Sequence, residues 1–388
     1  MHGYYQNLRL ALQALPDWIP RYLNARCSGD KVHVLFCMTD HFEAGNGRVS
    51  PAVEQERMDR LTNEYPRMAD QHHDSAGNKP KRTWFFPPHY HRRGNLRQLV
   101  QLCQEGYGEI ELHLHHGKTH PDTEENLEKT IRQCLHEYAL FGIFGSESGR
   151  KKYGFIHGDW ALSNSRKDGR FCGVDNEIDV LIRTGCYADF TLPTDGFECN
   201  PASINTVFYA KSDPTKRVPY RKGVPVEAGK RAPNQQLMIV QGPIHPYFKT
   251  RSLPGFRIFR DAINAGMPAS PSRMDWLVKT GIHVLGKPEW VIVKVSMHGA
   301  PDADWVLGEN MSLGFRHLES KFNTKQSRLH YVTARELYNI IKAAEAGESG
   351  DPEQHRNYQV TAPKYSSSPQ IDEASSALQA LVAKTYCG

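Results

Sequence analysis

The stretch "VHVLFCM", residues 32–38, holds six apolar residues in seven positions. A strand with one face in water alternates apolar and polar residues, whereas a strand covered on both faces is apolar almost throughout. This stretch therefore predicts a strand inside a parallel sheet, with other elements packed on both of its faces.

The same order of strand and then helix recurs at least five times along the chain. Further strands are expected at 83–88, 109–115, 153–158, 187–193 and 289–299 and in "LHYV". Helices are expected at 95–106, from Asp122 with Glu125 as its capping partner, at 177–185 and after Thr333 with Glu336 as its capping partner. This alternation predicts an α/β fold with a parallel sheet, either open or closed into a barrel.

Composition limits the class of protein. The 388 residues are 39% hydrophobic and 23% charged, with a net charge of +5 and no basic block, so we expect a globular protein that does not bind nucleic acid. The sequence contains no run of 18 or more apolar residues, so no transmembrane segment is expected. The eight cysteines form no CxxC pair, and Cys37, Cys103 and Cys134 lie in apolar patterns, so buried free thiols are expected.

The chain divides into three parts. Residues 1–30 predict an amphipathic helix without an export signal, which favours a cytoplasmic protein and allows a position near a membrane surface. Residues 31–345 carry the strand–helix alternation, interrupted at 196–257 by an insertion of loops around the strand "QLMIVQ". Residues 346–388 lose the periodicity and predict a C-terminal tail.

Histidines collect at the end of one predicted strand. In "IELHLHHGKTH", residues 110–120, strand alternation places Glu111, His113 and His115 on one face, and His116 follows as the chain leaves the strand. The carboxyl ends of parallel strands are where α/β folds place their sites. Two imidazoles there can bind a divalent ion if another segment adds a carboxylate or a third histidine.

Three other strand ends offer such groups. "MTDHFE" brings Asp40, His41 and Glu43 to the end of the first strand, "FIHGDW" brings His157, and "VIVKVSMHG" ends in His298. Polar residues at the ends of four strands predict a metal site or a polar catalytic site at this edge of the sheet.

These segments, in this order, resemble motifs of the polysaccharide deacetylase (NodB-homology, carbohydrate esterase) superfamily. "MTDHFE" is similar to its acidic motif, "TWFFPP" to its "TFF" strand, "GEIELHLHH" to its "EIGxH" strand, "TGCYADFTLP" to "GxxYDSSxxP", and "VKVSMHG" to its last catalytic strand. The resemblance covers residues 31–345, and the strings "HGDWALSNSRKDGRFCGVDNEIDVL" and "LHYVTARELYNIIKAAEAG" look like a divergent bacterial branch.

The resemblance implies a distorted (β/α) barrel of the glycoside hydrolase/deacetylase type. It also implies one divalent metal ion, zinc or a similar ion, held by an aspartate and two histidines. The implied reaction is hydrolysis of an N-acetyl group from an amino sugar of a surface polysaccharide or its precursor, so the expected partner is a carbohydrate.

The matching positions suggest catalytic and metal-binding roles. Asp40 stands where the acidic pair of the superfamily begins, as ligand, base or both, while His41 occupies the second place and Glu43 could take one of these roles. His113 matches the first metal histidine. His116 best matches the second, with His115 close behind on geometric grounds and His120 in a loop. His298 matches the catalytic histidine that would protonate the leaving amine.

A second set of positions matches segments expected near the substrate. His157, in "FIHGDW", takes the place of an arginine-containing motif, and Asp189 matches the aspartate of "YDSS". Asp159 and Asp189 would bond sugar hydroxyls or orient imidazoles. Trp160 and Tyr187 would either stack on a sugar ring or belong to the core.

Two other functions are compatible with these residues. One is a different metal-dependent amide or C–N hydrolase on the same barrel, which the strand-end histidines equally favour. The other is a catalytically inactive carbohydrate-binding protein, which is favoured by His41 in place of the second aspartate.

Overall fold

The computed structural model describes residues 31–88, 93–166, 168–193, 199, 203–213, 223–248 and 256–366. The amphipathic helix expected for residues 1–30 and the tail beyond residue 366 lie outside these residues. In the part of the chain that is described, no helix is long and apolar enough to cross a membrane.

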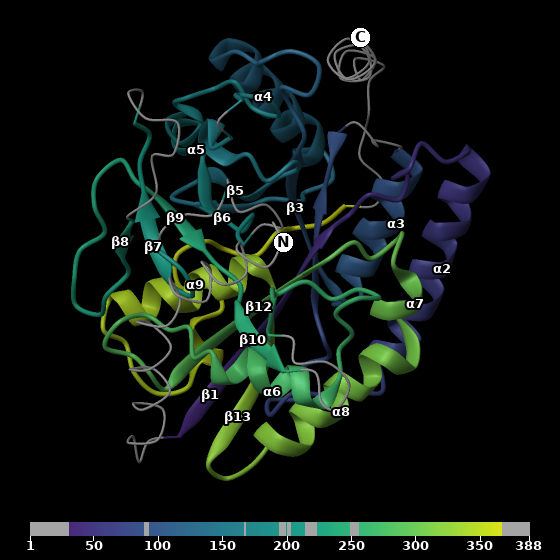
Figure 1. The fold of residues 1–388 in the computed structure, drawn as a ribbon, viewed down its shortest axis with the longest axis vertical. Helices are drawn as coiled ribbons and strands as arrows, with labels where there is room; N and C mark the ends of the chain where they lie inside the picture. Colours follow the sequence, from purple (N-terminus) through teal and green to yellow (C-terminus); the bar gives the residue numbers. More distant parts are fainter. Residues whose placement is uncertain are drawn as a thin grey trace.

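A large, mixed and mostly parallel sheet runs through the protein (Figure 1). Among the described residues its order is β12-β1-β2-β3-β5-β6-β9-β7-β8, with β13 paired to β1 and β4 to β5. The strands are β1 Val32–His41, β2 Arg82–Phe86, β3 Gly108–Leu114, β4 Gly145–Glu147, β5 Arg150–His157, β6 Cys186–Asp189, β7 Val207–Ala210, β8 Val224–Pro225, β9 Leu237–Val240, β12 Trp290–Met297 and β13 Ser327–Val332. A separate antiparallel pair consists of β10 His245–Phe248 and β11 Phe256–Phe259.

Strand β1 is the centre of the parallel part. One of its edges pairs with β12 from His33 to Asp40, while the other pairs first with β13 and then, from Met38 to His41, with β2. Because β12, β1, β2, β3 and β5 run in the same direction, their carboxyl ends meet at one edge of the sheet.

The helices cover both faces of this sheet, as the apolar run of residues 32–38 predicts. They are α2 Pro51–Ala69, α3 Arg93–Gln104, α4 Glu124–Ala139, α5 Glu177–Thr184, α6 Pro271–Lys279, α7 Ala303–Val306, α8 Gly308–Phe322 and α9 Ala334–Glu345. Figure 1 shows α2, α3 and α8 on one side of β1 and α9 on the other. Thr333 caps α9 in a capping box with Glu336, as expected.

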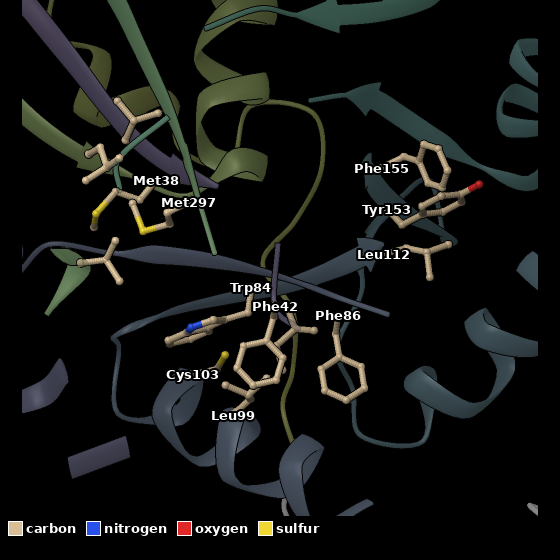
Figure 2. Close-up of a cluster of buried hydrophobic side chains, with 14 of the residues drawn as sticks. Met38, Phe42, Trp84, Phe86, Leu99, Cys103, Leu112, Tyr153, Phe155 and Met297 are labelled. Carbon is tan, nitrogen blue, oxygen red and sulfur yellow. The ribbon is translucent and has the colours of Figure 1, made fainter. Parts of the chain in front are cut away.

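Alternate residues of β1 enter two different cores. Val34, Phe36 and Met38 pack with side chains of α2, α3 and α8, whereas Leu35 and Cys37 pack against α9. Figure 2 shows part of the first core, where Trp84 and Phe86 of β2 and Phe42, which directly follows β1, lie over α3. The six cysteines among the described residues are buried and free, which confirms the expectation for Cys37, Cys103 and Cys134.

The structure differs from the expected elements in two places. Described residues of 196–257 form four short strands, β7 to β10, instead of loops around one strand, because strands of two to four residues carry no periodic pattern. Thr123 rather than Asp122 caps α4, and its side chain accepts a hydrogen bond from the backbone of Asn126.

Two further features connect distant parts of the fold. Isolated bridges from Glu227 to Leu285 and from Ile282 to Ile292 link the segment after β8 to β12, the strand at the other end of the sheet. Residues 346–366 pack back on the domain: the guanidinium of Arg335 donates to the carbonyl of Val360, and that of Arg356 to Glu336.

Burial of α9 predicts its contribution to stability. Replacing Ile340, which is 1% exposed, with alanine should lower the free energy of unfolding by about 2–5 kcal/mol, because a cavity is left in the second core. The matched change Leu313→Ala in α8, at a side chain 42% exposed, should cost less than about 1 kcal/mol. Urea unfolding of the two variants checks this, and equal losses would contradict the position of α9 in the core.

Candidate metal centre

A cavity of about 470 Å³ opens at the edge of the sheet where β1, β5 and β12 end. Polar side chains from loops and strand ends line much of it, together with two aromatic side chains. The lining residues include His41, Glu43, Asn46, His115, Lys118, Asp159, Trp160, Arg166, Phe171, Thr191, Arg260, Asn264, Ser296 and His298.

Three buried donor groups converge beside this cavity. Glu43 follows the end of β1, and its Oε1 lies 2.6 Å from Nε2 of His115 and 3.4 Å from Nε2 of His113. The donor atoms of these three residues all lie within 4.8 Å of one another. His113 and His115 reach the same point because residues two apart in an extended segment share a face.

The opposite nitrogen of each ring is held by the strand β5 and the loop after it. Nδ1 of His113 lies 3.0 Å from the carbonyl oxygen of Ile156, and Nδ1 of His115 lies 2.8 Å from Oδ2 of Asp159. Metal-ligating histidines typically have this arrangement, since a carbonyl or carboxylate on one nitrogen orients the other.

This arrangement leaves two acceptors facing each other. The carbonyl of Ile156 can only accept a hydrogen bond, so Nδ1 of His113 carries the proton and Nε2 of the neutral ring presents a lone pair to Glu43. A cation between them would satisfy both groups. Two imidazoles and one carboxylate are donors that suit zinc or a similar divalent ion and leave coordination positions open to the cavity.

Burial and hydrogen bonding shift the pKa values of these groups in different directions. Burial lowers the pKa of His113 below its ordinary value, so its neutral form is favoured. Burial also acts to lower the pKa of His115, but hydrogen bonds to Asp159 and Glu43 outweigh it and the net pKa is raised. For Glu43, burial acts to raise the pKa, and the close contacts with the imidazoles of His113 and His115 bring it far below the usual range. An ion must therefore displace a proton from His115.

Two more imidazoles stand next to the donors. The ring centre of His41 lies 5.0 Å from that of His113 and 4.9 Å from that of His298. Nε2 of His298 lies 3.9 Å from Oε2 of Glu43, and its side chain is 36% exposed. Both histidines line the cavity, so both can reach a bound molecule.

Asp40 does not join this group. It is fully buried, and its carboxylate accepts hydrogen bonds from Arg82 at 3.2 Å and from the backbone N–H of Gly299 at 2.7 Å. Asp40 is still within β1, so its side chain points to the opposite face from that of His41. The structure thus brings Glu43, rather than Asp40, to the histidines, and Asp40 anchors the loop that begins at His298.

The same strand alternation decides which of the histidines in residues 113–120 lies beside His113 at the candidate metal centre. His115 lies beside His113, while His116 turns to Asp122 and Glu177, with Nδ1 and Nε2 at 3.1 and 2.9 Å from their carboxylates. His120 is exposed.

The residues expected near the substrate are divided between cavity and interior. Asp159 and Trp160 line the cavity. His157 is buried with its ring centre 4.8 Å from that of His116. Asp189 is buried and accepts hydrogen bonds from the backbone and side chain of Thr191, and burial raises its pKa to about 7.

Tyr187 belongs to the core rather than to the cavity. It is 5% exposed and donates to Glu111 at 2.6 Å. The sequence allowed this ring either to stack on a sugar or to belong to the core, and the second position is observed.

Sequence reasoning missed several residues of the site. Lys118, Arg166, Phe171 and Arg260 reach the cavity from loops, where no periodic pattern marks them. Gly158 was detectable only by its place after a strand: a Cβ there would lie 2.4 Å from the ring of His115.

Comparison with known proteins provides no relative from which residue roles could be transferred. No protein-family model matches the chain, nor does any curated protein or solved structure. What the chain itself provides is a set of buried histidine, cysteine and glutamate groups that could hold a metal ion.

The close approach of Gly158 to His115 predicts a specific defect. Gly158→Ala should weaken metal binding at this centre at least ~10-fold, because the added methyl group displaces the imidazole. Gly94→Ala in α3, where no atom lies within 4 Å of the added Cβ, is the matched control and should bind metal normally. Equilibrium dialysis against Zn²⁺ measures both, and normal binding by the Gly158 variant would contradict the position of His115.

The raised pKa of His115 predicts proton release on metal binding. Below that raised pKa the ring is protonated, so binding should release a proton and the apparent affinity should increase as the pH rises. Asp159→Asn removes one cause of the shift and should decrease the release at neutral pH by up to about one proton per ion. Calorimetric titration with Zn²⁺ in buffers of different ionisation enthalpy measures this, and identical proton release by both proteins would rule out the assigned contact.

Proposed function

We propose that this chain is a metal-dependent hydrolase that removes an N-acetyl group from an amino sugar. The observation that carries the proposal is the convergence of Glu43, His113 and His115 on one point beside a cavity, with both Nδ1 atoms held by acceptors. The N-acetyl sugar, from a surface polysaccharide or its precursor, is the substrate class implied by the resemblance to polysaccharide deacetylases.

Glu43, His113 and His115 would hold the ion. A divalent ion bound there would polarise the acetyl carbonyl and lower the pKa of a water molecule towards ~7. The remaining steps require groups of this chain that bind the sugar and move protons.

His298 is the group best placed to protonate the leaving amine. Its side chain is partly exposed, lines the cavity and lies next to Glu43. An amine leaves readily only when it is protonated, so an acid at this place is required for cleavage of the C–N bond.

The proton of the attacking water requires a base that faces the cavity. Asp40, which the resemblance suggests, is bonded to Arg82 and Gly299 instead. His41 lines the cavity, and burial together with the charges of His298 and His113 holds its pKa well below the usual range. The lowered pKa keeps the ring neutral but also weakens it as a base, so we assign it as the base on its position, since it lines the cavity next to His113 and His298.

The lining of the cavity suits a sugar. Asp159, Thr191 and Asn264 offer hydrogen-bonding groups to hydroxyls, and Trp160 and Phe171 offer ring faces. The volume of about 470 Å³ lies within the range of sites that enclose small ligands.

The bridges between the ends of the sheet support the barrel that the resemblance implies. Hydrogen bonds join Leu285 to Val226, after β8, and Ile292 of β12 to Ile282. We infer that this segment closes the sheet into a distorted (β/α) barrel, with the cavity at the carboxyl ends of its strands.

A second candidate function is hydrolysis of another amide on the same site. Three cationic side chains, those of Lys118, Arg166 and Arg260, line the cavity. They favour an anionic substrate, which could be an acidic sugar or a small amide that carries a carboxylate or phosphate.

The acid role of His298 predicts a loss of turnover. His298→Ala should lower the rate of acetate release from N-acetylated amino sugars by at least ~10²-fold, while metal content stays unchanged. His317→Ala is the matched control, because this histidine pairs with Asp275 and does not line the cavity. Unchanged activity in the His298 variant would contradict the role, and no acetate release by the metal-loaded protein would contradict the substrate class.

A further inference from the structure

A second cluster of donor groups lies apart from the cavity. It consists of His116 after β3, His157 at the end of β5, Cys172 in the following loop and Glu177 at the start of α5. The four side chains are buried, with exposures of 0 to 2%, and one donor atom of each lies within 4.8 Å of all the others. None of the four lines the cavity.

Glu177 connects the members of this cluster. Its Oε1 lies 2.9 Å from Nε2 of His116 and 3.7 Å from Nε2 of His157. The thiol of Cys172 lies 3.4 Å from its Oε2. Four donor atoms are therefore directed at the same small volume: one nitrogen of each of two imidazoles, a sulfur atom and a carboxylate oxygen.

The ring nitrogens of His157 indicate that a ligand belongs in this volume. Its ring is fully buried, and neither Nδ1 nor Nε2 has a hydrogen-bond partner. A buried polar group without a partner is costly and needs an explanation. A cation bound to Nε2 supplies one, since the lone pair of a neutral imidazole is a metal donor.

The other three donors are oriented by outer partners. Nδ1 of His116 lies 3.1 Å from Oδ2 of Asp122. The backbone N–H of Ser163 donates to Oε2 of Glu177 at 2.6 Å, and that of Asn164 donates to the sulfur of Cys172 at 3.2 Å. A carboxylate on the second nitrogen of a histidine and backbone donors on carboxylate and sulfur are typical surroundings of metal ligands.

We propose that His116, His157, Cys172 and Glu177 bind a structural divalent metal ion of the zinc class. A thiolate and two imidazoles select zinc over calcium or magnesium, and four protein donors complete a tetrahedral shell. Binding releases the thiol proton of Cys172 to solvent, since the thiolate is the ligand. With no open position and no access to the cavity, this ion has a structural role.

The site would fix two residues of the candidate metal centre. His116 directly follows His115, and His157 lies two residues before Asp159. An ion between His116 and His157 thus ties together the two segments that carry the His115–Asp159 hydrogen bond. The surrounding loops are already close, because the backbone N–H of Asp122 donates to the carbonyl of Cys172 at 2.8 Å. This inference does not depend on the proposed reaction.

Cobalt substitution tests the site directly, because among the donor clusters of the described residues only this one includes a cysteine. The full-length protein is stripped with a chelator, loaded with Co²⁺ and examined by absorption spectroscopy. We expect a thiolate-to-cobalt charge-transfer band in the wild type. Cys172→Ser should lose the band and one molar equivalent of metal, while Cys134→Ser, at a buried cysteine of α4, should keep both. His113→Ala should lose an equivalent but keep the band.

X-ray absorption at the zinc edge of the wild type provides a second test that does not require the variant to fold. A sulfur scatterer at about 2.3 Å is expected. Absence of both the band and the sulfur scatterer from fully loaded protein would overturn the proposal. A band that is present in a protein without acetate release would support this site and contradict only the proposed reaction.

Discussion

A carboxylate buried among side chains must be paired with a cation or hydrogen-bond donors, and the candidate metal centre is built around this requirement of Glu43. It lies 6% exposed at the end of β1, and its nearest partner is the imidazole of His115 at 2.6 Å. The strand β3 must end in register to supply that ring. The loop after β5 must then supply Asp159 to hold the other nitrogen, and Gly158 to leave space for it. One paired charge thus relates the ends of three strands.

The sequence predicted much of this arrangement because it depends on short-range rules. Apolar runs marked the parallel strands, and alternation within residues 110–115 placed His113 and His115 on one face. The carboxylate was harder to choose. β1 extends to His41, beyond the expected end at Met38, so Asp40 still follows strand alternation and turns to Arg82, while Glu43 lies in the loop that bends towards β3.

Other parts of the site depend on contacts between segments far apart in the chain. His116 and His157 matched positions expected at the cavity, but both turn to Glu177, whose partner role no local pattern marks. Arg260 and Asn264 reach the cavity after β11, in a region where short strands lack periodicity. His115 and His116, adjacent residues of one segment, therefore belong to different donor clusters, of which the first lies beside the cavity and the second does not line it.

The candidate metal centre requires a divalent ion between Glu43 and the Nε2 atoms of His113 and His115. The most direct measurement is anomalous diffraction from crystals of the zinc-loaded protein, with data collected on both sides of the zinc absorption edge. We predict an anomalous peak within ~2.0–2.2 Å of Nε2 of both histidines and of a carboxylate oxygen of Glu43. A map from fully loaded protein without density at that point would contradict it and leave these histidines as hydrogen-bonding partners of a buried carboxylate.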